Sequence, residues 1–139
     1  MTATETWTRE EAVAPARDWG QALRRGLVSR CPACGEGRLF RAYLKPVERC
    51  AACGEDLSHQ RSDDAPPYIT ISVVGHVVIA ALMIVEQSFE TVPLWAHFSI
   101  WPALALGLSL WWLPAFKGAT IGHQWALRMH GFGAGKEST

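Results

Sequence analysis

Basic residues are missing from the middle of this 139-residue chain, and the gap divides it into two unlike parts. Ten of the 13 lysines and arginines lie at or before Arg61, and the next one is Lys117. The formal net charge is zero, so the chain lacks the excess positive charge that draws a protein to nucleic acid. We therefore expect no nucleic-acid partner, and a polar N-terminal part followed by an apolar part.

The beginning of the chain also lacks the apolar run of a secretory signal peptide, and it contains acidic residues. It favours a disordered N-terminal tail over residues 1–19. The sequence shows no phosphate-binding glycine loop and no paired nucleophile and base. We therefore expect a protein that is not an enzyme and has no small-molecule substrate.

Charged residues are absent from two long stretches, 67–85 and 92–116, which contain 19 and 25 residues. About 20 apolar residues cross the hydrocarbon core of a bilayer as a helix. The alternative is a buried pair of core helices in a soluble protein, but such helices usually have roughly 10–14 residues. The sequence predicts a transmembrane antiparallel hairpin over residues 63–116, with helices at about 67–86 and 92–116.

The connection between the two spans carries no lysine or arginine, whereas both outer flanks carry several. Because basic residues are retained on the cytoplasmic side, this pattern predicts a multi-pass membrane protein with both termini in the cytoplasm. Mixed apolar and basic residues in the flanks predict two short helices lying at the membrane surface. One begins the segment 20–62, and the other begins the segment 117–139, which ends in a C-terminal tail.

Cysteine is scarce, and its four copies fall into two Cys-x-x-Cys-Gly units, Cys31 with Cys34 and Cys50 with Cys53. The 15 residues between the pairs give a spacing typical of zinc sites. Cytoplasmic thiols stay reduced, which disfavours disulfides, whereas iron in a rubredoxin-like site and redox use stay open beside zinc. Four protein ligands leave no open position on zinc. We predict a structural Zn²⁺ site in a small β-hairpin ribbon within residues 20–62.

Ionisable side chains are rare in the predicted spans. His76 lies near the middle of the first span, and Glu86 and His97 lie at similar depths near the loop. Such groups are costly inside a bilayer and are functional hypotheses by default. For His76 the simpler alternative is a neutral imidazole bonded to a carbonyl. For Glu86 and His97 we favour a contact that joins the two helices, with proton handling or transient metal contact as alternatives.

Small residues recur every four positions on the second span, at Ser99, Ala103 and Gly107. Such a stripe lets two helix backbones approach closely, although ordinary membrane composition also produces it. Together with Trp95 and Trp101, the stripe is a candidate contact surface for a partner protein.

Four segments together resemble the DUF983 family of small bacterial membrane proteins: RGLVSRCPACGEGRLFRAYLK, CAACGEDLSHQRSDDAPPYITISVVGHVV, PLWAHFSIWPAL and PAFKGATIGHQ. The resemblance covers about residues 24–130 in the same order. It implies a cysteine ribbon followed by two transmembrane helices in the bacterial inner (cytoplasmic) membrane. It also implies an association with haem-copper cytochrome c oxidase and its assembly factors. The positions of this sequence that match the family pattern are Cys31, Cys34, Cys50, Cys53, Asp64, Glu86, Pro93, Trp95, His97, Trp101, Pro102, Lys117 and Gly118. The segment DDAPPY departs from the Gly-Pro that is commoner in the family, so we assign that turn no role.

The sequence therefore predicts a membrane α protein, a two-helix transmembrane hairpin preceded by a small cytoplasmic zinc ribbon. The expected function is that of an accessory subunit or assembly factor of a haem-copper cytochrome c oxidase, in contact with oxidase subunits and the lipid bilayer. The alternative is a membrane protein that handles metal or haem through His76, Glu86 and His97.

Overall fold

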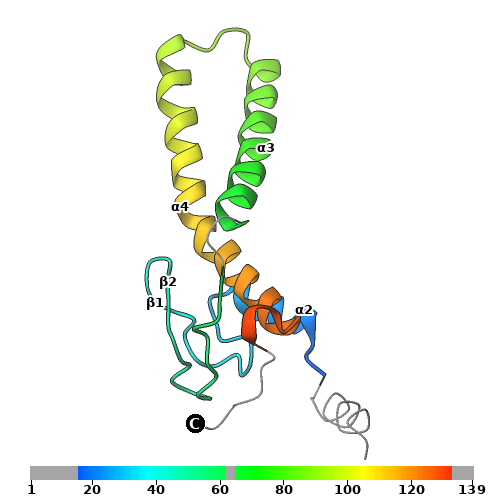
Figure 1. The fold of residues 1–139 in the computed structure, drawn as a ribbon. Coiled ribbons are helices and arrows are strands. Elements are labelled where there is room, and N and C mark those ends of the chain that lie inside the picture. The colour runs from blue at the N-terminus through cyan, green and yellow to red at the C-terminus, as the bar shows by residue number, and fades with distance from the viewer. Residues whose placement is uncertain (1–15, 62–64, 133–139) are drawn as a thin grey trace, which may run out of the picture.

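The computed structural model describes residues 16–61 and 65–132, in which two long helices stand side by side on a small foot (Figure 1). Residues 1–15 of the tail predicted over 1–19, residues 62–64 with Asp64, and the C-terminal 133–139 lie outside the described residues. The prediction of a tail is wrong for residues 16–19, because Arg17 contacts Trp125 and Asp18 caps the helix that begins at Trp19. The elements, in chain order, are α2 Trp19–Leu27, β1 Phe40–Ala42, β2 Lys45–Pro46, α3 Ala65–Ser88, α4 Leu94–Ala126 and the 3-10 helix η1 Met129–Gly131.

Helices α3 and α4 form the predicted antiparallel hairpin, joined by residues 89–93. At about 1.5 Å per residue, the 24 residues of α3 extend about 36 Å. Its first turn contains Pro66 and Pro67, where the missing N–H groups cost little. Thr70 and Val74 are buried on the side that meets α4. Both helices are long and apolar enough to span a membrane.

Helix α4 extends further than predicted, because it continues through Pro114 to Ala126 as one helix of 33 residues. The sequence predicted an end near Phe116 and a separate surface helix after Lys117, and the structure contradicts that separation. A proline inside a helix removes one backbone hydrogen bond, and the helix persists where another donor replaces it. Here the carbonyl left without a partner is that of Leu110, and the Tyr43 hydroxyl donates to it at 2.6 Å.

The foot contains the ribbon and the lower end of α4. Strands β1 and β2 pair antiparallel in the small hairpin that the sequence predicted, with Phe40 opposite Pro46 and Ala42 opposite Lys45. The core beneath the hairpin combines residues from distant parts of the chain: Leu39 and Leu57 of the ribbon and Ile121 of α4 are fully buried. The ribbon is therefore not closed within 20–62, because α4 supplies part of its core.

The helix predicted ahead of the ribbon is α2, and it packs against α4 in the foot. Asp18 caps its N-terminus by accepting a hydrogen bond from the Gln21 N–H at 3.0 Å. The two backbones nearly touch where they cross. A methyl group added at Gly26 would lie 2.1 Å from the Gly118 carbonyl oxygen, and one at Gly122 would lie 2.4 Å from the Ala22 oxygen. Small residues spaced by four on both helices permit this approach.

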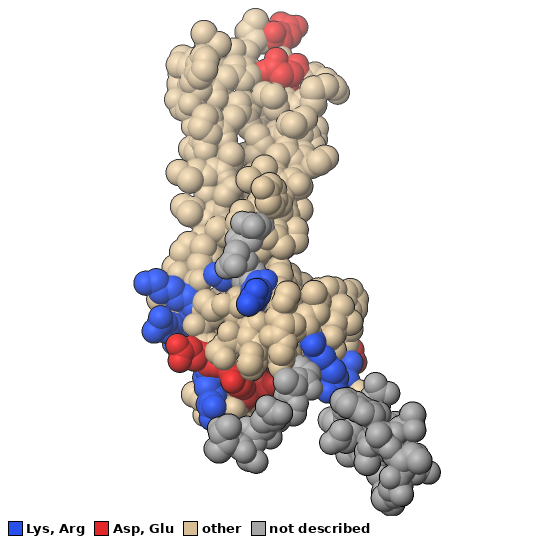
Figure 2. Space-filling view, in the orientation of Figure 1, with Lys and Arg blue, Asp and Glu red and all other residues tan. Residues whose placement is uncertain are grey.

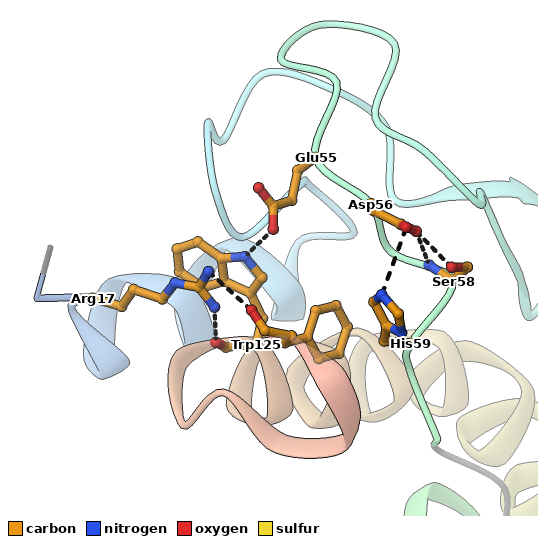
Figure 3. Close-up of polar contacts among 7 residues, drawn as sticks. Arg17, Glu55, Asp56, Ser58, His59 and Trp125 are labelled. Carbon is orange, nitrogen blue, oxygen red and sulfur yellow. Dashed lines mark hydrogen bonds and ion pairs between the residues drawn. The ribbon is translucent and has the colours of Figure 1, made fainter. Parts of the chain in front are cut away.

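Trp125 joins the ribbon to the lower end of α4 through its ring N–H, and a cation covers its ring (Figure 3). Its indole N–H donates to Glu55 Oε1 of the ribbon at 3.0 Å. The Arg17 guanidinium lies 4.2 Å from the ring centroid and donates to the Trp125 carbonyl at 2.6 Å. Burial among these groups lowers the pKa of Arg17 from its ordinary value. A buried aromatic ring with a satisfied N–H and a stacked cation is a stable joint between segments far apart in sequence.

Candidate metal centre

The four cysteines lie together, as the spacing of the two Cys-x-x-Cys units predicted. All are free thiols, and their sulfur atoms lie within 4.8 Å of one another. Cys31 Sγ lies 3.8 Å from Cys53 Sγ, and Cys34 Sγ lies 3.8 Å from Cys50 Sγ. A tetrahedral zinc site with Zn–S bonds of about 2.3 Å has sulfur–sulfur edges of about 3.8 Å. The cluster can therefore hold a metal ion such as zinc.

Two similar turns aim the sulfur atoms. Gly35 and Gly54 have φ angles of +75° and +77°, in the left-handed region that glycine tolerates. The Gly35 N–H donates to the Cys31 carbonyl at 2.8 Å, and the Gly54 N–H donates to the Cys50 carbonyl at 2.9 Å. The glycine that closes each unit thus has the backbone conformation its turn requires.

The sequence reasoning missed Gly37. A methyl group on this residue would lie 2.2 Å from Cys50 Sγ, so only a hydrogen fits between the first turn and the second pair of cysteines. The Gly37 N–H also points at Cys34 Sγ, at 3.5 Å, beside the N–H of Glu36 at the same distance. The available signal was the second glycine in CPACGEG, which the other unit, CAACGED, does not contain.

The thiols have different proton affinities. Burial raises the pKa of Cys31 and that of Cys53 above the usual value. The backbone N–H groups of Gly37 and Glu36 instead stabilise the Cys34 thiolate and lower its pKa to about 7. Four thiolates this close repel one another unless a cation neutralises them, so metal binding would release protons from this cluster.

Two polar contacts hold the ribbon hairpin against α4. The Tyr43 hydroxyl replaces the N–H that Pro114 cannot offer to Leu110, and the Lys117 ammonium donates to the Leu44 carbonyl at 2.8 Å. Leu44 has a φ of +58°, which is unfavourable for a non-glycine residue. The hydrogen bond from Lys117 holds the turn at the residue where its backbone is strained.

The structure brings Glu86 and His97 together at the loop end of the hairpin, with His97 Nε2 at 3.1 Å from Glu86 Oε1. Trp101 Nε1–H donates to His97 Nδ1 at 3.0 Å. An Nδ1 that accepts this bond carries no proton, so Nε2 carries it and donates to the carboxylate. His76 lies apart from them, with Nδ1 at 2.6 Å from the Ser72 carbonyl one turn earlier.

Four of the five candidate partner residues face away from α3. Trp95, Ser99, Ala103 and Gly107 are all exposed, and nothing lies within 4 Å of a methyl group placed on Gly107. Trp101 is half-buried and directs its N–H to the histidine. The stripe of small residues is therefore not used to pair the two helices of this chain.

Comparison with known families gives a match between residues 40–125 and the family described as "Protein of unknown function (DUF983)". The matched range is shorter than the 24–130 suggested by the resemblance, and it includes Cys50 and Cys53 but not Cys31 and Cys34. No curated protein and no solved structure matches the chain. The family match extends over more than half of the sequence, and the chain belongs to the DUF983 family.

Proposed function

We propose that this chain is a non-enzymatic integral membrane protein with a structural zinc ribbon, and that it acts as an accessory subunit or assembly factor of a haem-copper cytochrome c oxidase. The observation that carries the proposal is the four-cysteine cluster built onto the continuation of α4. A site with four protein ligands offers no position for a substrate, so its role is to hold the ribbon in shape. The ribbon then presents a fixed surface at the foot of the hairpin.

Membrane insertion is supported by where the apolar side chains point. Only 11% of the most apolar 18-residue window of α3, and 0% of that of α4, is buried. A core helix of a soluble protein would be mostly buried, whereas a lone membrane hairpin exposes its apolar residues to lipid. Basic side chains gather on the foot, where acidic ones lie among them, whereas the charged side chains at the loop end are acidic (Figure 2). The distribution agrees with a cytoplasmic foot and both termini in the cytoplasm of a bacterial cell.

The exposed face of α4 supports a partner protein within the membrane. A stripe of small residues beside large apolar ones allows a membrane helix of another protein to approach closely. Gly107 has open space around it, so this glycine is explained by a contact outside the chain more readily than by one inside it. The choice of oxidase subunits as the partner rests on the association that the family resemblance implies.

Affinity purification of the full chain in mild detergent tests the proposal, with identification of co-purifying subunits and elemental analysis of the same sample. The expected result is one zinc per chain together with oxidase subunits. Iron in place of zinc would change the metal assignment, and a folded protein without metal would overturn the structural site. A preparation without oxidase subunits would overturn the assignment of the partner.

A second candidate function is metal or haem handling through His76, Glu86 and His97. The contact between Glu86 and His97 is the observation that supports this function, but both imidazole nitrogens of His97 already have partners. Binding a metal there would cost one of those hydrogen bonds, which favours a contact that joins the hairpin. Substituting His97→Ala separates the two functions. Loss of metal or haem in a partner with normal association supports handling, and weakened association with normal cofactor content supports the structural role.

A further inference from the structure

A groove of about 400 Å³ opens between the ribbon hairpin and α4, on the foot and close to the long helices. Its lining combines two arginines with an apolar wall and a tyrosine. The residues that line it are Ser29, Arg38, Phe40, Arg41, Ala42, Tyr43, Leu44 and Pro114.

The charge of the groove is of one sign. Arg38 and Arg41 are exposed, and no acidic residue lines the groove. Among the residues that the structure describes, neither guanidinium has a hydrogen bond or an ion pair. By contrast, the guanidinium groups of Arg25 and Arg30 donate to ribbon carbonyls. Two free guanidinium groups beside an apolar wall suit a ligand with an anionic head and an apolar body.

The length of α4 indicates at which level of the membrane the groove lies. Leu94 and Pro114 are 20 positions apart, which corresponds to about 30 Å along the helix, the thickness of the hydrocarbon core. Trp111, 73% exposed, stands one turn before Pro114, where an interfacial aromatic residue is expected. With the membrane placement proposed above, which this step requires, Pro114 lies at the boundary between acyl chains and headgroups.

We propose that this groove binds the phosphate of an anionic phospholipid in the cytoplasmic leaflet. Arg38 and Arg41 bind the phosphate oxygens, because a guanidinium can donate two parallel N–H bonds to an anion of this shape. Leu44 and Pro114 contact the beginning of the acyl chains. The hydrogen bond from Tyr43 to the Leu110 carbonyl fixes the groove against α4, so the two arginines are held at headgroup depth.

The test uses the full chain purified in a mild detergent, mixed with phosphatidylglycerol or phosphatidylcholine and examined by native mass spectrometry. The variant Arg38→Gln/Arg41→Gln is compared with Arg24→Gln/Arg49→Gln, which removes two exposed cations outside the groove. We expect the wild type and the control pair to retain phosphatidylglycerol in preference to phosphatidylcholine. Removing two cations next to an anionic lipid should weaken its retention about 30-fold in the groove variant.

Three results would overturn the proposal: equal retention of the two lipids by the wild type, an equal loss in both double variants, or displacement of phosphatidylglycerol by millimolar inorganic phosphate. The last would identify a site for free phosphate rather than for a lipid. Metal content measured on the same samples keeps this test separate from the proposed function. A groove variant that keeps its metal and loses the lipid supports the lipid site, whereas a wild type without metal contradicts only the zinc ribbon.

Discussion

The crossing of α2 and α4 gives the sharpest test of how the ribbon is held, through the substitution Gly118→Ala. The added methyl carbon would lie 1.9 Å from the Gly26 carbonyl oxygen and 2.9 Å from its carbonyl carbon. Both are backbone atoms, so no side-chain rotation can relieve the clash. To restore ordinary contact, the helices would have to separate by about 1.5 Å, in a close-packed interior that resists such movement.

The expected cost combines two opposing effects. Overpacking of a well-packed site costs about 1–3 kcal/mol, and contact with rigid backbone places this case near the upper end. Alanine is a better helix former than glycine by about 1 kcal/mol, which offsets part of that cost. We therefore expect Gly118→Ala to lower the free energy of unfolding of the foot by about 1–2 kcal/mol.

Gly107→Ala is the matched control on the same helix. Its methyl group would enter open space, so only the helix-propensity gain applies and the stability should stay equal or rise by up to about 1 kcal/mol. Two measurements compare both variants with the wild type. One is thermal unfolding in detergent, and the other is the rate at which bound metal is released to a coloured chelator. The metal of the Gly118 variant should be released about 5- to 30-fold faster than in the wild type if the opening of the foot controls its release. Equal behaviour of the two alanine variants would refute the close crossing.

Three further substitutions test separate contacts. Tyr43→Phe removes the donor to the Leu110 carbonyl and should cost about 1 kcal/mol in thermal unfolding, and unchanged stability would contradict that contact. Cys50→Ser removes one of four thiolates and should abolish stoichiometric metal in elemental analysis, so full retention would contradict the cluster. Trp101→Phe frees Nδ1 of His97, and nitrogen NMR should then show both neutral tautomers where the wild type shows one.

The elements predicted best are those whose signal is local in the sequence. The spacing of four cysteines and the glycine after each pair are sufficient to predict two turns that face each other, because thiolate ligands are few and specific. Two uncharged stretches likewise predict two long helices, since length and hydrophobicity decide that question without tertiary information.

The end of α4 could not be predicted in the same way. Pro114 favours a stop in the sequence, and the group that replaces its missing hydrogen bond is Tyr43, 71 positions earlier. A replacement this far away in the chain depends on the ribbon already being docked. The close crossing did leave a signal, because Gly118 and Gly122 are spaced by four, next to Ile121 and Trp125 with the same spacing. Together they mark one helix face with both a close approach and a core contact.

The shared core would couple a metal bound at the cysteine cluster to the long helices. A ribbon of this size would owe much of its stability to that metal, and Leu39 and Leu57 are buried only while the ribbon keeps its shape. Those two side chains pack against Ile121, so loss of the metal would expose apolar surface on α4 as well as on the ribbon. The same change would withdraw Tyr43 from the Leu110 carbonyl and leave α4 with an unpaired backbone group at Pro114. Metal removal should therefore be detected in the hairpin, where hydrogen exchange around residues 110–114 would rise together with exchange in the ribbon.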